Sequence, residues 1–533
     1  MRNIRLLDCT LRDGGYLNDW KFGHDVICNI FERLVGSGVD VIEIGFLNDS
    51  RDFDINRTIM PDTDCVEKIY GQLDRGNSMI VGMIDFGTCS IEHIKPCSES
   101  YIDGIRVIFK EHLMYDALEF CRKLKDMGYI VFAQLVSVTT YTDEKLVELT
   151  KIVNEVEPFA LSMVDTYGLT HSEDIVHIFR VLDNNLKPEI CIGYHAHNNF
   201  QLGYANSLAI LKEETDRDVL VDGTLYGMGK SAGNAPLELL AMYMNEKCGK
   251  QYDTEQMLEA IETSILEIQK SVQWGYNMFY YVAASTRCHP SYVSYYMNKK
   301  TLSMKSVNEI LNSLEEDKKL FYDKKYAEGV YLDYQKSECN DEGAVKELQG
   351  KFLKKSVVVF GPGETIETEK EKIASFMGSQ KDVVIIAINY IPKGVKPEYL
   401  FLTNSKRYIQ LGSVLQQLEN KDISIIATSN VTKTSGKFTY ELNYEKLIDV
   451  ETEIQDNSLV MLLKILKRSR VAEVNLIGFD GYIEDKMNYF KSNMQYDFVN
   501  NKGNYLNDYV NQFLQLVKDD MTIHFVTTTQ YQE

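Results

Sequence analysis

A short β-branched segment followed by an amphipathic segment recurs eight times in the N-terminal part of this 533-residue chain. The segments expected to form strands are residues 4–10, 39–46, 79–85, 104–110, 129–138, 159–165, 190–197 and 219–226. Helical patterns between them include residues 26–37, 115–127, 143–156, 172–182 and 201–212. Strand–helix alternation predicts parallel strands joined by right-handed crossovers. Eight such units favour a closed (β/α)8 barrel, the TIM barrel, over an open sheet.

The pattern changes after residue 252. Residues 253–348 predict a helical extension packed on the barrel, with the clearest helical patterns at 255–270, 285–299 and 306–322. The polar residues 335–351 mark the next boundary. An α/β alternation returns in residues 353–533, with strands expected at 356–360, 383–389, 398–402, 423–428, 473–477 and 522–526. We expect an open Rossmann-like sheet there. The predicted organisation is therefore α/β in three parts: 1–252, 253–348 and 353–533.

Charge and cysteine content exclude several classes of protein. The chain has 57 basic and 78 acidic residues, a formal charge of −21, which argues against nucleic acid or an anionic membrane as partner. No stretch of about 18 apolar residues and no signal peptide is found, so we expect no membrane span. The ten cysteines form no C-x-x-C pair, which predicts reduced thiols in a cytoplasmic protein. Homo-oligomer formation is left open.

Candidate metal ligands follow the first and seventh predicted strands, where barrels place their catalytic groups. His195 and His197 are two residues apart on a strand, so both side chains point to the same side and can bind one cation. One strand alone separates the first from the seventh in a closed barrel, so Asp13 can supply a third ligand. Two imidazoles and a carboxylate leave positions open for substrate. This donor set favours Mn²⁺ or Mg²⁺, with Zn²⁺ or Co²⁺ as alternatives.

Three motifs together resemble a known superfamily. They are D-x-T-L-R-D-G at residues 8–14, H-x-H-N at 195–198 and G-x-G-x-x-x-G-N-x-x-x-E at 227–238. Residues 1–285 resemble the metal-dependent HMG-CoA lyase-like (DRE-TIM) superfamily, and look most similar to its 4-hydroxy-2-oxovalerate aldolase branch. Gly15-Tyr16 and the W-G-Y-N-M-F-Y-Y segment at 274–281 favour that branch over the synthases.

The resemblance implies the roles of several residues. Asp13, His195 and His197 would be the metal ligands, and Arg12 would be the catalytic arginine beside a substrate oxygen. The pyruvate aldolases carry an acid–base histidine where this chain has Tyr16. Tyrosine has a pKa near 10, so Tyr16 is expected to donate a proton or orient the substrate. The general base is left open among metal-bound water, Tyr276 and an unidentified group.

The implied activity is that of an aldolase or lyase that makes or cleaves a C–C bond of a 2-oxo acid such as pyruvate. The divalent metal and Arg12 would stabilise the negative charge of an enolate. The partners would be a small-molecule 2-oxo acid and an aldehyde. The expected substrate-binding residues are Glu43, Gln134, Ser137, Thr166 and Asn234. A structural hydrogen bond is an equally good interpretation of Glu43.

Three other functions remain open at this level. The first is a Claisen-type synthase that uses acetyl-CoA, and the second is a Schiff-base aldolase with Lys110 as nucleophile. The third is a non-catalytic barrel that presents a glycan-related C-terminal domain. The intact R-D, H-x-H and G-N motifs favour a metal-dependent enzyme over the second and third of these. A CoA-dependent assay separates the Claisen-type synthase from an aldolase.

A glycine-rich turn follows the first strand predicted in the C-terminal part. Gly361 and Gly363 lie in F-G-P-G-E, whose backbone amides could bind a phosphate, and Asp480 lies in G-F-D-G after a later strand. The pair weakly resembles the turns of Rossmann-like, sialyltransferase-type glycan enzymes, but Glu364 replaces the serine of their G-x-G-P-S turn. These three residues are candidates for nucleotide binding, with a structural turn as the alternative. An active domain would connect the protein to polysaccharide biosynthesis.

Overall fold

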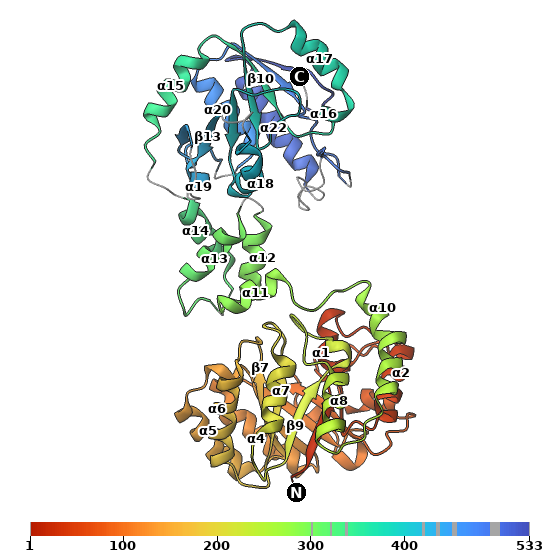
Figure 1. Ribbon diagram of the computed structural model, residues 1–533. Coiled ribbons are helices and arrows are strands. Elements are labelled where there is room, and N and C mark those ends of the chain that lie inside the picture. The colour runs from red at the N-terminus through yellow and green to blue at the C-terminus, as the bar shows by residue number, and fades with distance from the viewer. Residues whose placement is uncertain are drawn as a thin grey trace. The chain divides into compact units, whose positions relative to one another are not determined.

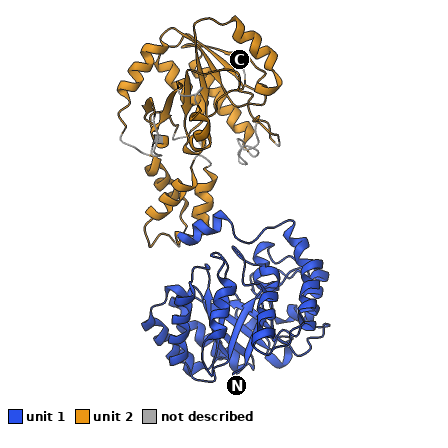
Figure 2. Cartoon of the chain, in the orientation of Figure 1, with its two compact units in different colours: residues 1–285 blue, residues 286–533 orange. Residues whose placement is uncertain are grey.

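The structure is a computed structural model (Figure 1). It describes residues 2–299, 302–319, 322–335, 339–417, 422–432, 438–449, 456–484, 486–490 and 502–531. The chain forms two compact units, Met1–Ser285 and Thr286–Glu533, which we call unit 1 and unit 2 (Figure 2). The helices predicted as one extension are shared between the two units, and the three-part division stays a prediction.

Unit 1 is a closed parallel barrel of eight strands, which confirms the predicted TIM barrel. The barrel strands are β1 (Ile4–Asp8), β2 (Val41–Leu47), β4 (Met79–Asp85), β5 (Gly104–Phe109), β6 (Ile130–Leu135), β7 (Ala160–Asp165), β8 (Cys191–Ala196) and β9 (Val219–Gly223). Strand β9 pairs with both β1 and β8, so a single strand separates the first barrel strand from the seventh. A two-residue strand, β3 (Ile59–Met60), adds to β2 and was not predicted.

Helices surround the barrel (Figure 1). They are α2 (His24–Gly36), α3 (Thr63–Tyr70), α4 (Met114–Asp126), α5 (Asp143–Val156), α6 (Ser172–Asn185), α7 (Gly203–Lys212) and α8 (Leu237–Lys247). Helix α2 shows why they pack this way: Ile27, Ile30, Phe31 and Leu34 recur at helical spacing and are buried in the core between helices and strands. The apolar stripe of each helix thus covers the outer face of the sheet.

The barrel interior is filled in layers. The lower layer is an apolar cluster of Leu7, Cys9, Val41, Val81, Phe132, Ala160, Cys191 and Leu220. Side chains alternate along a strand, so residues two positions further on also face the interior. Glu43, Gln134 and Asp222 occupy such positions after Val41, Phe132 and Leu220, and they are buried. A polar layer therefore lies between the apolar layer and the carboxyl ends of the strands.

The first of the three helices predicted here is confirmed, since residues 254–269 are helical without a break, but the other two are shorter than predicted. Residues 255–270 form α9 (Thr254–Ala260), a π-helical turn (Ile261–Ile265) and α10 (Leu266–Gln269). Residues 285–299 divide into the end of α11 (Met278–Ser285) and α12 (Pro290–Asn298). Helix α12 begins at Pro290 because proline suits the first helical position and the His289 side chain accepts a hydrogen bond from the Ser291 amide.

The third predicted helix, residues 306–322, is also corrected. Helix α13 (Met304–Ser313) begins where the Ser303 side chain caps the Ser306 amide, and it ends at Ser313, before an extended Leu314. Residues 320–321 lie outside the described residues. Helices α14 (Lys324–Gln335) and α15 (Glu342–Phe352) follow and lead to the second sheet.

The sheet of unit 2 is open and entirely parallel, as predicted, in the order β14-β13-β12-β11-β10-β15-β16. Its strands are β10 (Ser356–Phe360), β11 (Val383–Ile388), β12 (Tyr399–Leu402), β13 (Ser424–Thr428), β14 (Tyr440–Leu442), β15 (Glu473–Ile477) and β16 (Thr522–Phe525). The helices associated with it are α16 (Thr365–Thr368), α17 (Lys370–Ser379), α18 (Ser405–Leu415), α19 (Ser429–Thr432), α20 (Ser458–Arg468) and α22 (Gly503–Val517). Separate apolar clusters lie on its two faces, one with α15, α20 and α22 and the other with α17 and α18. The three-residue strand β14 was not predicted.

Candidate metal centre

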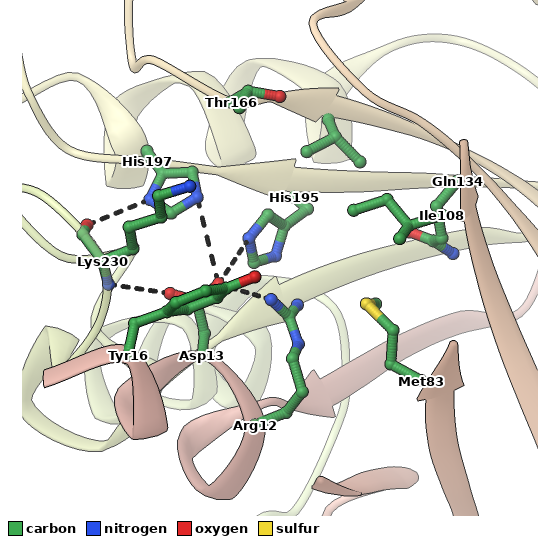
Figure 3. A pocket seen from close by; sticks show the side chains of 11 residues that line it. Arg12, Asp13, Tyr16, Met83, Ile108, Gln134, Thr166, His195, His197 and Lys230 are labelled. Atoms are coloured by element: carbon green, nitrogen blue, oxygen red, sulfur yellow. Dashed lines mark hydrogen bonds and ion pairs between the residues drawn. The ribbon is translucent and has the colours of Figure 1, made fainter. Parts of the chain in front are cut away.

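Asp13, His195 and His197 meet at the carboxyl ends of the barrel strands (Figure 3). Asp13 ends the one-turn helix α1 (Thr10–Asp13) that follows β1, and the histidines lie in β8 and directly after it. The Asp13 Oδ2 atom is 3.5 Å from His195 Nε2 and 3.9 Å from His197 Nε2. One ligand atom from each residue lies within 4.8 Å of the other two. The structure therefore brings the three predicted ligands close enough to bind one ion.

The protonation states of these groups fit a divalent cation. Burial would raise the pKa of Asp13, but the Arg12 guanidinium and the two imidazoles hold it well below its usual range. Burial lowers the pKa of His197 to about 4, so its imidazole is neutral near pH 7. The buried His195 Nε2 atom has no hydrogen-bond partner among the described residues. An anion, a neutral imidazole and an orphaned buried nitrogen form a donor set for a metal ion.

The G-M-G-K-S-A-G-N loop after β9 positions two of the candidate ligands. Asp13 Oδ1 accepts hydrogen bonds from the Lys230 amide at 2.9 Å and from the Asn234 side-chain amide at 3.0 Å. The Lys230 carbonyl oxygen lies 3.3 Å from His197 Nδ1. A hydrogen bond from that nitrogen would leave His197 Nε2 as the free, metal-facing atom.

Gly229 is required by this close approach. A Cβ atom at this position would lie 2.0 Å from Asn234 Nδ2 and 2.7 Å from Asp13 Oδ1. We expect Gly229→Ala to displace both side chains and to weaken Mn²⁺ binding by about 10- to 100-fold, the range seen when groups that orient a ligand are lost. Equilibrium dialysis against Mn²⁺ measures the change.

Gly249→Ala is the control for Gly229→Ala, because no atom lies within 4 Å of the Cβ position of Gly249 at the surface of unit 1. The φ of +71° at Gly249 adds backbone strain, but this strain lies away from the site. Unchanged Mn²⁺ affinity in Gly229→Ala would show that the loop does not position Asp13.

In the polar layer beneath the site, acidic and basic side chains alternate in a continuous series of contacts from His195 to Arg12. His195 Nδ1 is 3.0 Å from Asp222 Oδ2, and Asp222 also accepts a hydrogen bond from the Arg106 guanidinium. Arg106 Nη1 is 3.0 Å from Glu43 Oε1, and Glu43 Oε2 accepts a hydrogen bond from Arg12 Nε at 2.6 Å. Arg106, Glu43 and Asp222 have fully buried side chains. This layer holds Arg12 and the His195 ring in place.

Arg106 and Asp222 were missed in the sequence. Each is a charged residue within an otherwise apolar strand, at a position that alternation turns toward the interior. That signal was available, because an arginine is almost never fully buried unless it is paired. Glu43 was predicted, and the structure places it in this ion-pair layer rather than in the cavity lining.

A cavity opens above the three candidate ligands. Its lining is Arg12, Asp13, Tyr16, Met83, Ile108, Gln134, Val164, Thr166, His195, His197 and Lys230. The sequence interpretation missed Lys230 and the three apolar residues. Tyr16 lies at the mouth, 41% exposed, and burial of part of the phenol raises its pKa to about 12. Tyr276 is 56% exposed and does not line this cavity, so its catalytic role stays a prediction.

The predicted substrate contacts are only partly in the cavity. Gln134 lines it, but its amide binds Arg106 at 3.0 Å and the Ser162 hydroxyl at 3.0 Å. Thr166 also lines it, and its hydroxyl accepts a hydrogen bond from the Ser137 amide at 2.8 Å. Ser137 does not line it and supports Thr166 instead. Asn234 reaches the site through Asp13, as described above.

The candidate nucleotide site in unit 2 contains a carboxylate of its own. Gly363 approaches Asp480 so closely that a Cβ would lie 2.5 Å from the carboxylate, and the Thr365 amide donates to Asp480 at 2.8 Å. The Gly361 amide donates to the Ile477 carbonyl of β15. The Thr365 amide, which a bound phosphate would need as a donor, thus already donates to the Asp480 carboxylate. Nucleotide binding by this turn stays a prediction.

None of the remaining histidines belongs to a cluster with metal-ligand geometry in the described ranges, and Cys9 is the one cysteine that does. Both three-residue clusters with metal-ligand geometry include His195, the second with Cys9 and Asp222. All ten cysteines are free thiols. In the described ranges, every helix is too short or too polar to pass through a bilayer.

Residues 3–264 match the protein family described as HMGL-like. The 4-hydroxy-2-oxovalerate aldolase of Chloroflexus aggregans is 28% identical over 249 residues, 46% of this chain and 70% of that relative. The 2-isopropylmalate synthase of Sulfolobus acidocaldarius is 27% identical, over 46% of this chain and 64% of the relative. The crystal structure of hydroxymethylglutaryl-CoA lyase from Pseudomonas aeruginosa is 16% identical, with a TM-score of 0.43 over 51% of this chain and 95% of that one.

The matched residues lie within unit 1 and include all three motifs and the cluster of candidate ligands. The resemblance of the C-terminal part to sialyltransferase-type enzymes lies outside the matched residues and stays a prediction. With its closed parallel barrel and its R-D, H-x-H and G-N motifs in place, unit 1 of this chain is an HMGL-like domain.

Proposed function

We propose that unit 1 is a divalent-metal-dependent aldolase or lyase that makes or cleaves a C–C bond of a 2-oxo acid of the pyruvate type. The observation that carries this proposal is the convergence of Asp13, His195 and His197 beneath an open cavity. The His195 Nε2 atom is buried there without a hydrogen-bond partner among the described residues. The names of the relatives, aldolase and synthase, support C–C bond chemistry at such a site. We propose Mn²⁺ or Mg²⁺ as the ion.

The ion, when bound, supplies Lewis-acid catalysis and a template for the 2-oxo acid. The chain's own residues supply orientation and further charge. Arg12 is fixed by Glu43 and Asp13 while it lines the cavity, so its guanidinium can stabilise negative charge that develops on a substrate oxygen. Met83, Ile108 and Val164 give the cavity an apolar wall that keeps water from part of the reacting region.

Tyr16 is proposed to donate a proton or a hydrogen bond, and not to act as the general base. Its pKa of about 12 keeps the phenol protonated from pH 6 to 9. We expect Tyr16→Phe to lower kcat by about 100-fold or more, since one acid–base group typically contributes about 10²–10⁴-fold. The shape of the pH–rate profile between pH 6 and 9 should not change. Rates of the two proteins across this range test the expectation. Loss of a limb of the profile in Tyr16→Phe would assign base duty to this phenol.

The function is tested by hydrogen exchange of pyruvate. The full chain is incubated with pyruvate and Mn²⁺ in D2O, and the methyl protons are followed by NMR. We expect deuterium to replace them, because a site that stabilises the enolate also catalyses its reversible formation, and we expect EDTA to stop the exchange. Absence of exchange from pyruvate would contradict the pyruvate-type assignment. Release of free CoA thiol from acetyl-CoA in the presence of a 2-oxo acid would instead identify a Claisen-type synthase.

A further inference from the structure

Lys230 is the one side chain of the cavity whose charge the site does not use. Its backbone is fixed by Asp13 and His197, and its ammonium lies over the Tyr16 ring, 5.0 Å from the ring centroid (Figure 3). In the part of the chain that the structure describes, no carboxylate lies within 4.0 Å of this ammonium. A lysine whose backbone is fixed and whose ammonium is stacked on an aromatic ring is preorganised to bind an anionic group.

The charges beneath the cavity are otherwise balanced by the proposed metal and substrate. The buried layer holds two guanidinium groups, Arg12 and Arg106, against three carboxylates, Asp13, Glu43 and Asp222. A divalent ion turns this deficit of one charge into an excess of one positive charge. The carboxylate of a 2-oxo acid then cancels that excess, and the positive charge of Lys230 remains unbalanced.

A second lysine lies at the same end of the barrel, outside the cavity lining. Lys110 follows β5, and Asp85 ends the neighbouring strand β4. Lys110 and Lys230 both act electrostatically on Asp85. No carboxylate lies within 4.0 Å of Lys110 either, within the described residues. Lys110, Lys230 and Asp85 thus carry one net positive charge among them at the carboxyl ends of the barrel strands, the end at which the cavity opens.

We propose that Lys230 is a specificity-determining residue that binds a second anionic group, a carboxylate or a phosphate, on the part of the substrate remote from its 2-oxo acid end. This inference rests on the proposed function, because the metal site fixes which end of the substrate lies deep in the cavity. It narrows the substrate class: the aldehyde that is condensed or released carries an oxyanion. A neutral aldehyde would leave the Lys230 ammonium without an anionic partner.

The test is binding of two matched 2-oxo acids to the Mn²⁺-loaded full chain, by isothermal titration calorimetry at low salt. 2-Oxoglutarate and 2-oxopentanoate have the same five carbons and differ by the terminal carboxylate. We measure at pH 6.5, where Asp8, whose pKa burial raises to about 7, is mostly protonated and adds little charge. The dicarboxylate is expected to bind about 10-fold tighter, equivalent to about 1.4 kcal/mol, and the ratio should shrink as salt is added.

Variants assign this preference to Lys230. We expect the affinity ratio of the two acids to fall toward one in Lys230→Gln and to be largely kept in Lys230→Arg. Because the ratio is measured within one protein, a general loss of affinity cancels. Lys212→Gln is the matched control. Lys212 ends helix α7 on the side of the barrel where the strands begin, so this variant loses the same charge but should keep the wild-type affinity ratio. Equal affinities in the wild-type chain, or an unchanged ratio in Lys230→Gln, would overturn the inference.

Condensation rates identify the anionic group and separate this inference from the proposed function. Pyruvate is offered with succinate semialdehyde or butanal, and with D-glyceraldehyde 3-phosphate or D-glyceraldehyde. We expect a higher kcat/KM for the charged aldehyde than for the neutral one in at least one pair. The pair in which charged and neutral aldehydes differ more shows whether the group bound by Lys230 is a carboxylate or a phosphate. Equal kcat/KM within both pairs, in a protein that exchanges the pyruvate methyl protons, would contradict the inference alone. A protein that exchanges no protons would contradict the proposed function instead.

Discussion

Asp13→Asn is expected to lower the Mn²⁺-dependent exchange of pyruvate methyl protons by more than about 1,000-fold and to weaken Mn²⁺ binding by about 100-fold or more. The substitution keeps the shape of the side chain but removes the negative charge of Asp13, the one carboxylate of a ligand set whose other two members are imidazoles. NMR in D2O measures the exchange, and equilibrium dialysis measures the affinity.

The matched control for Asp13→Asn is Asp216→Asn. Asp216 is exposed in the loop that precedes β9, at the amino end of the barrel, so its substitution should change neither value. Wild-type Mn²⁺ affinity in Asp13→Asn would remove this carboxylate from the ligand set. Retained circular dichroism and an unchanged transition midpoint without metal ensure that a loss reflects the site and not unfolding.

Arg106→Met is expected to destabilise unit 1 by about 3–5 kcal/mol. The guanidinium pairs with Glu43 and Asp222 with no exposure to water, and its removal leaves two buried carboxylates without their common partner. The free energy of unfolding is taken from the urea transition that Mn²⁺ shifts, since that transition belongs to the unit that binds the ion. Neutralising both carboxylates as well, in the triple variant with Glu43→Gln and Asp222→Asn, should recover part of the loss.

Arg122→Met provides the comparison for Arg106→Met. Arg122 forms an exposed ion pair with Glu119 one turn earlier on α4, and such pairs contribute about 0–1 kcal/mol. A loss in Arg106→Met no larger than that in Arg122→Met would show that the buried layer does not depend on this guanidinium. Arg106→Lys should recover little, because an ammonium cannot bind two carboxylates and the Gln134 oxygen in the same planar geometry.

The alternation of strands and helices was sufficient to predict the barrel, because hydrophobic periodicity reports burial directly. Strand β4 and helix α5 have the predicted bounds, Met79–Asp85 and Asp143–Val156. Once the barrel was expected, the position of Asp13, His195 and His197 followed from strand order and alternation alone.

Other parts of the site depend on tertiary contacts that periodicity does not report. Lys230 lines the cavity because its backbone is fixed by Asp13 and His197, residues far away in sequence. Arg106 finds its partners on β2, β6 and β9, which no local pattern specifies. The two-residue strand β3 and the three-residue strand β14 are too short to produce a period.

The most direct test of the metal centre is an anomalous difference map from crystals of the full chain grown with Mn²⁺, collected at the manganese absorption edge. One strong peak is expected in unit 1, about 2.0–2.3 Å from Asp13 Oδ2, His195 Nε2 and His197 Nε2. A map without a peak between these three atoms, at an Mn²⁺ concentration that supports exchange of the pyruvate methyl protons, would contradict the proposed metal centre.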